Sequence, residues 1–254
     1  MTGWAVLMEQ EGRIHVVELL DDNRKYKGLG VINTNALLSG KEYGEEVLIG
    51  QKYLKLMPPR LPELIAGMKR RAQTISSKDA GLIVAKLGIG EGDTVLEAGL
   101  GSGGLSLHLA KALGSKGHLV TVESREEHAE VGLENLQRAS HCFAGFPKHT
   151  HISGMVEEVV PDLEFDAIIL DMPVHSKAII SCSKFLKIGG RIACYAPTTS
   201  QLESCWDACE NSGLNVEWAG ELMEREWGKT SKGGMRPVNG PFGHTAFLIF
   251  AQKY

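Results

Sequence analysis

The first 58 residues contain short runs in which apolar and polar positions alternate. Alternation with a period of two is typical of β-strands, and a glycine-containing turn between two such runs is typical of a hairpin. Two pairs of runs follow this pattern, residues 4–8 with 14–19 and residues 46–49 with 53–56. Three prolines between positions 58 and 62 then mark a boundary. We therefore predict a small β domain over residues 1–60.

The pattern changes after this boundary, where short apolar runs alternate with segments of helical period. The runs at 94–98, 118–122, 166–170, 191–195 and 245–251 are predicted as strands, and the segments 105–113, 126–139 and 201–212 as helices. The run that ends at Leu170 is unbroken, as expected for a strand buried on both faces. Because strands that alternate with helices form parallel sheets covered on both sides, we predict a doubly wound, Rossmann-like α/β domain over residues 61–254.

The strongest local signal is a glycine-rich loop between the strand at 94–98 and the helix that follows it. The loop reads Glu97-Ala98-Gly99-Leu100-Gly101-Ser102-Gly103-Gly104. Glycines allow the backbone to approach a ligand closely, and the helix N-terminus offers free N–H groups. The glycines also satisfy the G-x-G-x-x-G pattern of dinucleotide sites, with Glu123 following at the expected distance. The loop alone therefore leaves open a nicotinamide dinucleotide or S-adenosylmethionine as its ligand.

Three further features favour S-adenosylmethionine. Glu97 precedes the first glycine, where an acid can meet the cationic methionine end of this cofactor, whereas a dinucleotide places its pyrophosphate at the helix N-terminus. Asp171 and Pro173 follow the strand at 166–170, at the end where a doubly wound sheet binds its substrate. The chain also ends in an apolar strand after a long loop, as many methyltransferases do. The alternative for both acids is a purely structural role as a cap or ion pair.

Charge restricts the partners. The formal net charge of -4 does not indicate a nucleic-acid-binding protein, so any such surface has to be a local patch. Two candidate patches are Lys69-Arg70-Arg71 and the looser set Lys229, Lys232 and Arg236. Each is either a phosphate-binding surface or an ordinary solvated face.

Other features of the sequence lead to exclusions. The five cysteines are irregularly spaced and are expected to be reduced thiols of an intracellular protein. His141, His149 and His151 have no carboxylate or cysteine pattern beside them, so no metal site is expected. No run approaches the roughly 20 apolar residues that span a membrane, and no signal peptide is expected. The expected location is the cytoplasm, with the nucleus as an alternative in a eukaryote.

Taken together, these motifs resemble the tRNA (adenine-N1)-methyltransferases that act on adenine 58 of the T loop. The segment Gln73-Thr74-Ile75-Ser76-Ser77-Lys78-Asp79-Ala80 looks like the one before the first methyltransferase helix of that family. The glycine loop looks like its cofactor loop, and Leu170-Asp171-Met172-Pro173 like its catalytic motif. Arg236-Pro237 and Gly243-His244-Thr245-Ala246-Phe247-Leu248 look like its C-terminal signature, the most specific of these elements. The resemblance covers most of the chain, including the N-terminal β domain.

The resemblance implies a class I methyltransferase fold, S-adenosylmethionine as cofactor, tRNA as partner and a homotetrameric assembly. It makes Asp171 the catalytic residue, a carboxylate that raises the nucleophilicity of adenine N1 through the neighbouring 6-amino group. The target base has to leave its stack, which costs less in a loop than in a duplex. The cofactor-binding residues implied are Glu97, Gly99, Leu100, Gly101, Ser102, Gly103, Gly104, Leu105, Glu123, Ser124, Met155 and Asp171. The substrate-binding residues implied are Ser76, Lys78, Arg236 and His244.

The chain departs from the family pattern at four places around one pocket. Ser76 stands where the family usually has tyrosine, Leu100 where it has threonine, and Met155 where it has aspartate. After Pro173 the chain continues Val174-His175-Ser176 instead of acid-proline-tryptophan. Two alternatives therefore stay open, a noncatalytic tRNA-binding subunit and a small-molecule methyltransferase. We expect His175 at the rim of the pocket, and a structural role for His244 that ties the last strand to its loop.

Overall fold

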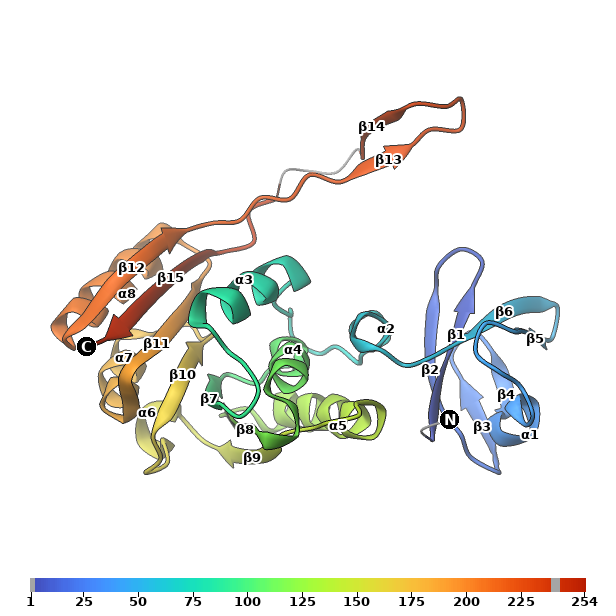
Figure 1. Ribbon diagram of the computed structural model, residues 1–254, viewed down its shortest axis with the longest axis horizontal. Coiled ribbons are helices and arrows are strands. Elements are labelled where there is room, and N and C mark those ends of the chain that lie inside the picture. The colour runs from blue at the N-terminus through green and yellow to red at the C-terminus, as the bar shows by residue number, and fades with distance from the viewer. Residues whose placement is uncertain (1–2, 239–242) are drawn as a thin grey trace.

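The computed structural model describes residues 3–238 and 243–254, and a seven-stranded sheet forms its centre (Figure 1). The strands follow the order β12-β15-β11-β10-β7-β8-β9. The last strand along the chain, β15, is antiparallel to both of its neighbours, β12 and β11. Their bounds are β7 (Thr94–Ala98), β8 (His118–Glu123), β9 (Lys148–Ser153), β10 (Phe165–Leu170), β11 (Leu186–Ala196), β12 (Leu214–Gly220) and β15 (Phe247–Lys253). The predicted doubly wound α/β fold is confirmed.

Helices cover both faces of this sheet, as Figure 1 shows. The first face carries α3 (Ser77–Leu87), α4 (Gly104–Leu113) and α5 (Glu126–Cys142), and the second carries α6 (Val156–Val159), α7 (Ser176–Cys182) and α8 (Thr199–Asn211). Two short 3-10 helices, η1 (Gly114–Lys116) and η2 (Ser183–Phe185), follow α4 and α7. Successive strand residues point to opposite faces, so Ile169 enters the core under the first set of helices and Ile168 and Leu170 enter the other. This explains the unbroken apolar run of β10.

The N-terminal part forms a separate antiparallel sheet with the order β2-β1-β6-β5. Its strands are β1 (Trp4–Glu9), β2 (Ile14–Glu18), β5 (Glu46–Ile49) and β6 (Lys52–Met57), which confirms both predicted hairpins. A small hairpin of β3 (Asn23–Tyr26) and β4 (Gly30–Asn33) and the helix α1 (Thr34–Leu38) complete a third apolar core. The hydrophobic pattern does not predict β3 and β4, because none of their residues is buried. It does not predict α1 either, because five residues are too few to show a helical period.

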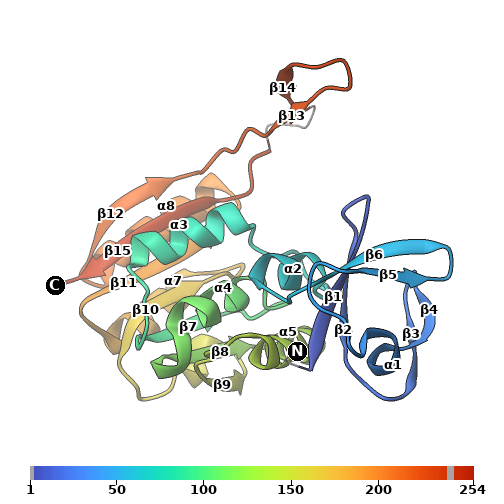
Figure 2. The same ribbon diagram turned by 45° about the vertical axis from the view of Figure 1, so that its right-hand side comes forward.

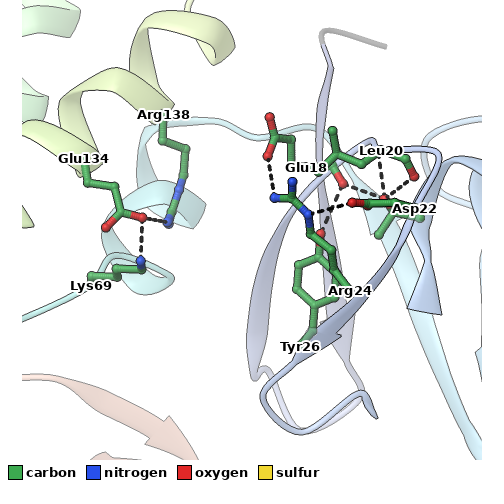
Figure 3. A network of polar contacts seen from close by, with 9 residues as sticks. Glu18, Leu20, Asp22, Arg24, Tyr26, Lys69, Glu134 and Arg138 are labelled. Atoms are coloured by element: carbon green, nitrogen blue, oxygen red, sulfur yellow. Dashed lines mark hydrogen bonds and ion pairs between the residues drawn. The ribbon is translucent and has the colours of Figure 1, made fainter. Parts of the chain in front are cut away.

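The N-terminal sheet packs on the larger unit through α2 (Leu61–Ala66) and α5, and Figure 2 shows α2 between the small sheet and α4. Arg138 of α5 is central to this contact: its guanidinium lies 5.4 Å from the Trp4 ring centre and donates to the Gly67 carbonyl at 3.2 Å. Glu134 pairs with Lys69 at 2.5 Å and lies 3.9 Å from Arg138 (Figure 3). The domain boundary at residue 60 stays a prediction.

A hairpin of β13 (Trp227–Lys229) and β14 (Met235–Pro237) projects away from the large sheet between β12 and β15 (Figures 1 and 2). Two side chains hold the base of this arm. Lys78 donates to the Leu222 carbonyl at 2.7 Å and to Thr245 Oγ1 at 2.9 Å. His244 contacts Glu221 Oε2 at 2.7 Å and the Pro197 carbonyl at 3.0 Å, which ties the segment before β15 to two neighbouring loops. These contacts agree with a structural role, and contact of His244 with a substrate stays a prediction.

Candidate active site

The site lies where the chain order reverses across the sheet, between β7 and β10. The helix after β7 covers one face and the helix after β10 covers the other, which leaves a crevice at the carboxyl ends of these strands. Two backbone hydrogen bonds join the two loops there. Asp171 donates to the Ala98 carbonyl at 2.5 Å, and Gly99 donates to the Asp171 carbonyl at 3.0 Å. The backbone of Asp171 is therefore fixed against the glycine loop.

Two adjoining cavities occupy this crevice. The first has a volume of about 270 Å³ and the second of about 330 Å³. They share Gly99, Glu123, Arg125, Asp171, Met172 and Pro173. The first alone is lined by Ala98, Val122, Ser124, Gly154, Met155, Val156, Glu157 and Val174. The second alone is lined by Ala72, Gln73, Gly101, Pro197 and Gln201. Asp171 thus lies between two spaces, which is where a group acting on two ligands has to be.

The glycines of the loop serve two different purposes. A Cβ atom at Gly99 would lie 2.9 Å from Glu123 Oε2, on the cavity side of the loop. Gly103, with a φ of +78°, lies against α5, where a Cβ atom would come within 3.1 Å of the Gly132 carbonyl. Gly99 therefore keeps the cavity open, whereas Gly103 lets the loop pack closely on a helix.

Glu123 ends β8 and is nearly fully buried. Its Oε2 accepts the Gly101 N–H at 2.9 Å, and its Oε1 accepts the N–H of Arg125 at 3.1 Å and that residue's Nε at 3.2 Å. Burial alone would raise the pKa of this carboxyl, but these hydrogen bonds and the Arg125 charge outweigh burial and hold the pKa below its ordinary value. Glu123 is thus a fixed carboxylate with one lone pair of Oε2 left for a ligand.

Glu97 and Asp171 are carboxyls of the opposite kind. Glu97 is 2% exposed, and burial raises its pKa to about 8, while a hydrogen bond from Ser106 Oγ at 2.5 Å lowers it and the Asp171 charge raises it further. Burial raises the pKa of Asp171 to about 6; the neighbouring His175 lowers it and the Glu123 charge raises it. A carboxyl with a pKa near neutrality is suited to exchange a proton with a ligand.

The remaining predicted loop residues do not line either cavity. The Leu100 side chain packs against Gly132, and Leu105 of α4 lies in the apolar core. Ser102 Oγ accepts the N–H groups of Arg71 and Ala72 at 3.0 Å each. Gly103 and Gly104 pack against α5 and Thr74, and Glu97 lies behind Ala98, outside both linings. Contacts of these residues with a cofactor stay predictions, whereas Gly99, Gly101, Glu123, Ser124, Met155 and Asp171 do line the cavities.

The predicted substrate-binding residues are distributed over two regions. Ser76 caps α3, where its Oγ donates to Asp79 Oδ2 at 2.9 Å, and Lys78 Nζ donates to Asp79 Oδ1 at 2.7 Å. These two polar side chains are engaged within the protein. Arg236 lines a cavity of about 580 Å³ on the projecting hairpin, together with Lys229 and Lys232. The structure therefore brings the second basic patch together.

One expectation is wrong. His175 is not at the pocket rim but is 3% exposed, and its Nε2 lies 3.2 Å from the Tyr195 carbonyl. The turn after Pro173 folds this side chain inward, beneath the end of β11. His175 lowers the pKa of Asp171, although it lies outside both cavity linings.

Sequence reasoning missed Gln201, whose Nε2 donates to the Pro173 carbonyl at 3.1 Å. Gln201 also closes a capping box with Thr198 at the start of α8. The spacing of threonine and glutamine is a signal for that cap. The contact with Pro173 has no signal in the sequence, because it joins a loop to a helix 28 residues further along the chain.

The described residues were also searched for metal sites, disulfide bonds and membrane-spanning helices. No group of three or more His, Cys, Asp or Glu side chains within them is arranged to hold a metal ion, and all five cysteines are free thiols. None of the helices in the described part of the chain is long and apolar enough to cross a membrane.

The fold and the paired cavities define the protein as a Rossmann-like methyltransferase. A SAM-dependent O-methyltransferase from Thermotoga maritima superposes with a TM-score of 0.82 at 29% identity, covering 100% of this chain and 94% of that chain. The tRNA (m1A58) methyltransferase TrmI from Aquifex aeolicus superposes with a TM-score of 0.74 at 25% identity, covering 99% of this chain and 96% of that one. The predicted class is confirmed.

The chain belongs to the family described as tRNA methyltransferase complex GCD14 subunit, whose model matches residues 52–231. The tRNA (adenine(57)-N(1)/adenine(58)-N(1))-methyltransferase TrmI of Methanocaldococcus jannaschii is 29% identical over 99% of this chain and 95% of its own length. The tRNA (adenine(58)-N(1))-methyltransferase TrmI of Thermus thermophilus is also 29% identical, over 99% of this chain and 97% of its own length. The family inferred from the motifs is confirmed.

Proposed function

We propose that this protein is an S-adenosylmethionine-dependent methyltransferase that modifies N1 of adenine 58 in the T loop of tRNA. The relatives whose names carry this activity match almost the whole chain. The observation that carries the proposal is the place of Asp171, between two adjoining cavities and with a pKa near 6. One cavity suits the cofactor and the other suits the target base.

The first cavity fits the nucleoside part of this cofactor. Its walls include the apolar side chains of Val122, Met155 and Val156, which suit a purine face. The free lone pair of Glu123 Oε2 suits a ribose hydroxyl, and Gly99 leaves room where a Cβ atom would intrude. We further propose that Glu97 faces the methionine ammonium group when the cofactor is bound.

The cofactor supplies an activated methyl group, so the protein mainly has to align the acceptor nitrogen. We propose that the adenine enters the second cavity with its 6-amino group towards Asp171. At neutral pH Asp171 is largely ionised and accepts a hydrogen bond from that amino group, which increases the electron density at N1. After N1 is alkylated, the 6-amino group becomes more acidic, and in this proposal an Asp171 carboxylate oxygen accepts its proton. Gln201 keeps the Asp171–Pro173 segment in position.

The projecting hairpin supports a role in tRNA binding and assembly. Lys229, Lys232 and Arg236 line one cavity there, and cations gathered on an overall acidic protein suit phosphate groups. Trp227 and Met235 on the same hairpin are mostly exposed, as expected for a surface that packs on a second copy. We propose a homotetramer, a domain boundary near residue 60, and action in the cytoplasm, or in the nucleus of a eukaryote.

The test is transfer of labelled methyl from S-adenosylmethionine to an unmodified tRNA transcript, with the modified position mapped. We expect label at N1 of adenine 58 and none in a transcript that carries guanine at that position. The Asp171→Ala variant should bind S-adenosylhomocysteine but transfer no methyl group. Label at another position, or full turnover of the variant, would contradict the proposal.

A small-molecule methyltransferase is the second candidate, because the similar protein from Thermotoga maritima is described as a SAM-dependent O-methyltransferase, a description that does not mention tRNA. Cofactor binding without any affinity for tRNA would support it. A noncatalytic subunit would instead bind tRNA and not the cofactor. The same two binding measurements, with tRNA and with S-adenosylhomocysteine, therefore separate the three functions.

A further inference from the structure

One cation lines the two otherwise acidic cavities of the site. Among the described residues that line either cavity, Arg125 is the only lysine, arginine or histidine, and it lines both cavities. The acids in the same linings are Glu123, Glu157 and Asp171. These acids suit the proposed cofactor, which is cationic at its sulfonium and ammonium groups. Its one carboxylate belongs to the methionine end, which the proposed function places at Glu97, outside both linings. Arg125 is therefore expected to serve the other ligand, the methyl acceptor.

The Arg125 side chain is held along one edge and open along another. Its Nε donates to Glu123 Oε1 at 3.2 Å, and its backbone N–H donates to the same oxygen at 3.1 Å. No described residue accepts a hydrogen bond from its two Nη groups, and 56% of the side chain is exposed. The two Nη groups form a planar fork that can pair with two oxygens of one phosphate. Glu123 thus fixes the direction of Arg125 and leaves a phosphate-binding edge free.

The acceptor proposed above brings a phosphate to the mouth of the second cavity. Adenine is uncharged, and a base that has left its stack enters the cavity while its sugar-phosphate chain stays in solvent. The nearest anions of such an acceptor are the phosphates on the two sides of the target nucleotide. Helix α5 begins directly after Arg125, but its first turn carries the exposed acids Glu126 and Glu127, which repel a phosphate. The guanidinium of Arg125 is therefore the group at this mouth that suits a phosphate.

We propose that Arg125 binds the phosphate next to the target nucleotide and thereby makes the second cavity specific for an adenine inside a polynucleotide chain. The inference rests on the proposed tRNA substrate. Asp171 acts on the base and does not distinguish a free nucleoside from a nucleotide in a chain, whereas a bidentate arginine–phosphate pair does. The same contact fixes the register of the RNA, so that the base beside the bound phosphate is the one that enters the cavity.

The first measurement is the salt dependence of binding between the full chain and an unmodified tRNA transcript. Loss of one phosphate contact reduces the slope of log affinity against log salt by about 1. We expect Arg125→Gln to show this reduction and to bind tRNA about tenfold or more weakly, with its affinity for S-adenosylhomocysteine changed less than about threefold. The matched control is Arg191→Gln. The Nε of Arg191 also donates to a carboxylate, Glu217 Oε2 at 2.8 Å, but Arg191 lies outside both cavity linings, so the control should keep the wild-type slope.

The second measurement identifies the phosphate. A tRNA assembled by ligation carries one uncharged methylphosphonate linkage, on either the 5′ or the 3′ side of adenine 58. One of the two replacements should weaken binding to the wild type about tenfold, and the same replacement should have no effect on Arg125→Gln. Arg125→Lys keeps the charge without the planar fork and should recover part of the affinity and part of the sensitivity to that linkage.

Each other outcome overturns the inference. If Arg125→Gln keeps the wild-type slope, or responds to the neutral linkages as the wild type does, Arg125 does not bind this phosphate, and methylation of tRNA by the wild type leaves the proposed function intact. A variant that loses S-adenosylhomocysteine and keeps its affinity for tRNA assigns Arg125 to the cofactor carboxylate instead. A folded wild type that binds no tRNA overturns the proposed substrate, and the role of Arg125 with it.

Discussion

The buried carboxyl of Glu97 makes a strong prediction about the pH dependence of stability. Its folded-state pKa is about 8, against an ordinary value of 4.5, chiefly because the side chain is buried behind the glycine loop. The folded protein therefore binds more protons than the unfolded chain between these two values. Stability should fall as pH rises through this window, because the charged form is tolerated in the unfolded state and not in the core.

The size of the effect follows from the difference between the two pKa values. One pH unit is worth about 1.4 kcal/mol, so the difference of about 3.5 between the two values corresponds to at most about 5 kcal/mol. Glu97→Gln is neutral at every pH, has the same shape and can still accept the Ser106 hydroxyl. The variant should have the same free energy of unfolding as the wild type near pH 4.5, and it should become the more stable of the two as the pH rises to 8.

The assay is urea unfolding at several pH values between 4.5 and 9, with Glu158→Gln as a control that removes an exposed acid. Equal pH dependence of the wild type and Glu97→Gln would refute the reasoning. The same variant also tests the proposed function. If Glu97 faces the methionine ammonium group, Glu97→Gln should weaken binding of S-adenosylhomocysteine while stabilising the empty protein, a combination typical of a functional buried charge.

Three further predictions concern the site and its support. The rate of methyl transfer should fall about tenfold per pH unit below pH 6, because Asp171 acts in its ionised form and its pKa is about 6. A pH–rate profile with its acid limb near pH 4 would contradict this. Gln201→Glu keeps its cap on α8 but loses the donor to the Pro173 carbonyl, so steady-state kinetics should show a lower kcat with KM for the cofactor within about twofold, and an unchanged kcat would exclude this positioning role. Arg138→Leu should cost about 1–3 kcal/mol in thermal unfolding, whereas the exposed pair of Arg24 is worth about 0–1 kcal/mol, so equal losses in Arg138→Leu and Arg24→Leu would contradict the interface role.

The fold was predictable from the sequence wherever strands are buried. β10 shows an unbroken apolar run because its two faces enter two cores. β9 is an edge strand of the same sheet, with the sequence Lys148-His149-Thr150-His151-Ile152-Ser153. It has no apolar run, so its sequence pattern does not predict a strand. Edge strands take their form from pairing with a neighbour, in this case β8, and pairing leaves no mark on local periodicity.

The candidate site was predictable only where its residues terminate strands. Glu123 and Asp171 follow directly after apolar runs, and the carboxyl ends of parallel strands meet at one edge, so their proximity follows from topology alone. Gln201, Glu157 and Gln73 reach the cavities from helices and loops whose placement depends on tertiary packing. His175 was misplaced for the same reason, because the fold of a turn decides whether its side chain points in or out.

Three of the four departures from the family pattern have local explanations in this structure. Ser76 caps α3, a role that a serine hydroxyl fills and a tyrosine cannot. Leu100 packs against Gly132 of α5, where a Cβ atom on the glycine would come within 2.6 Å of Leu100 Cγ, so the larger residue in the loop is matched by a smaller one in the helix. Met155 contributes apolar surface to the first cavity, and Glu157, two residues further on, supplies an acid to the same lining. Because Leu100 is matched by Gly132, and because Glu97, Glu123 and Asp171 are all in place, these substitutions favour an adapted methyltransferase over one that has lost its site.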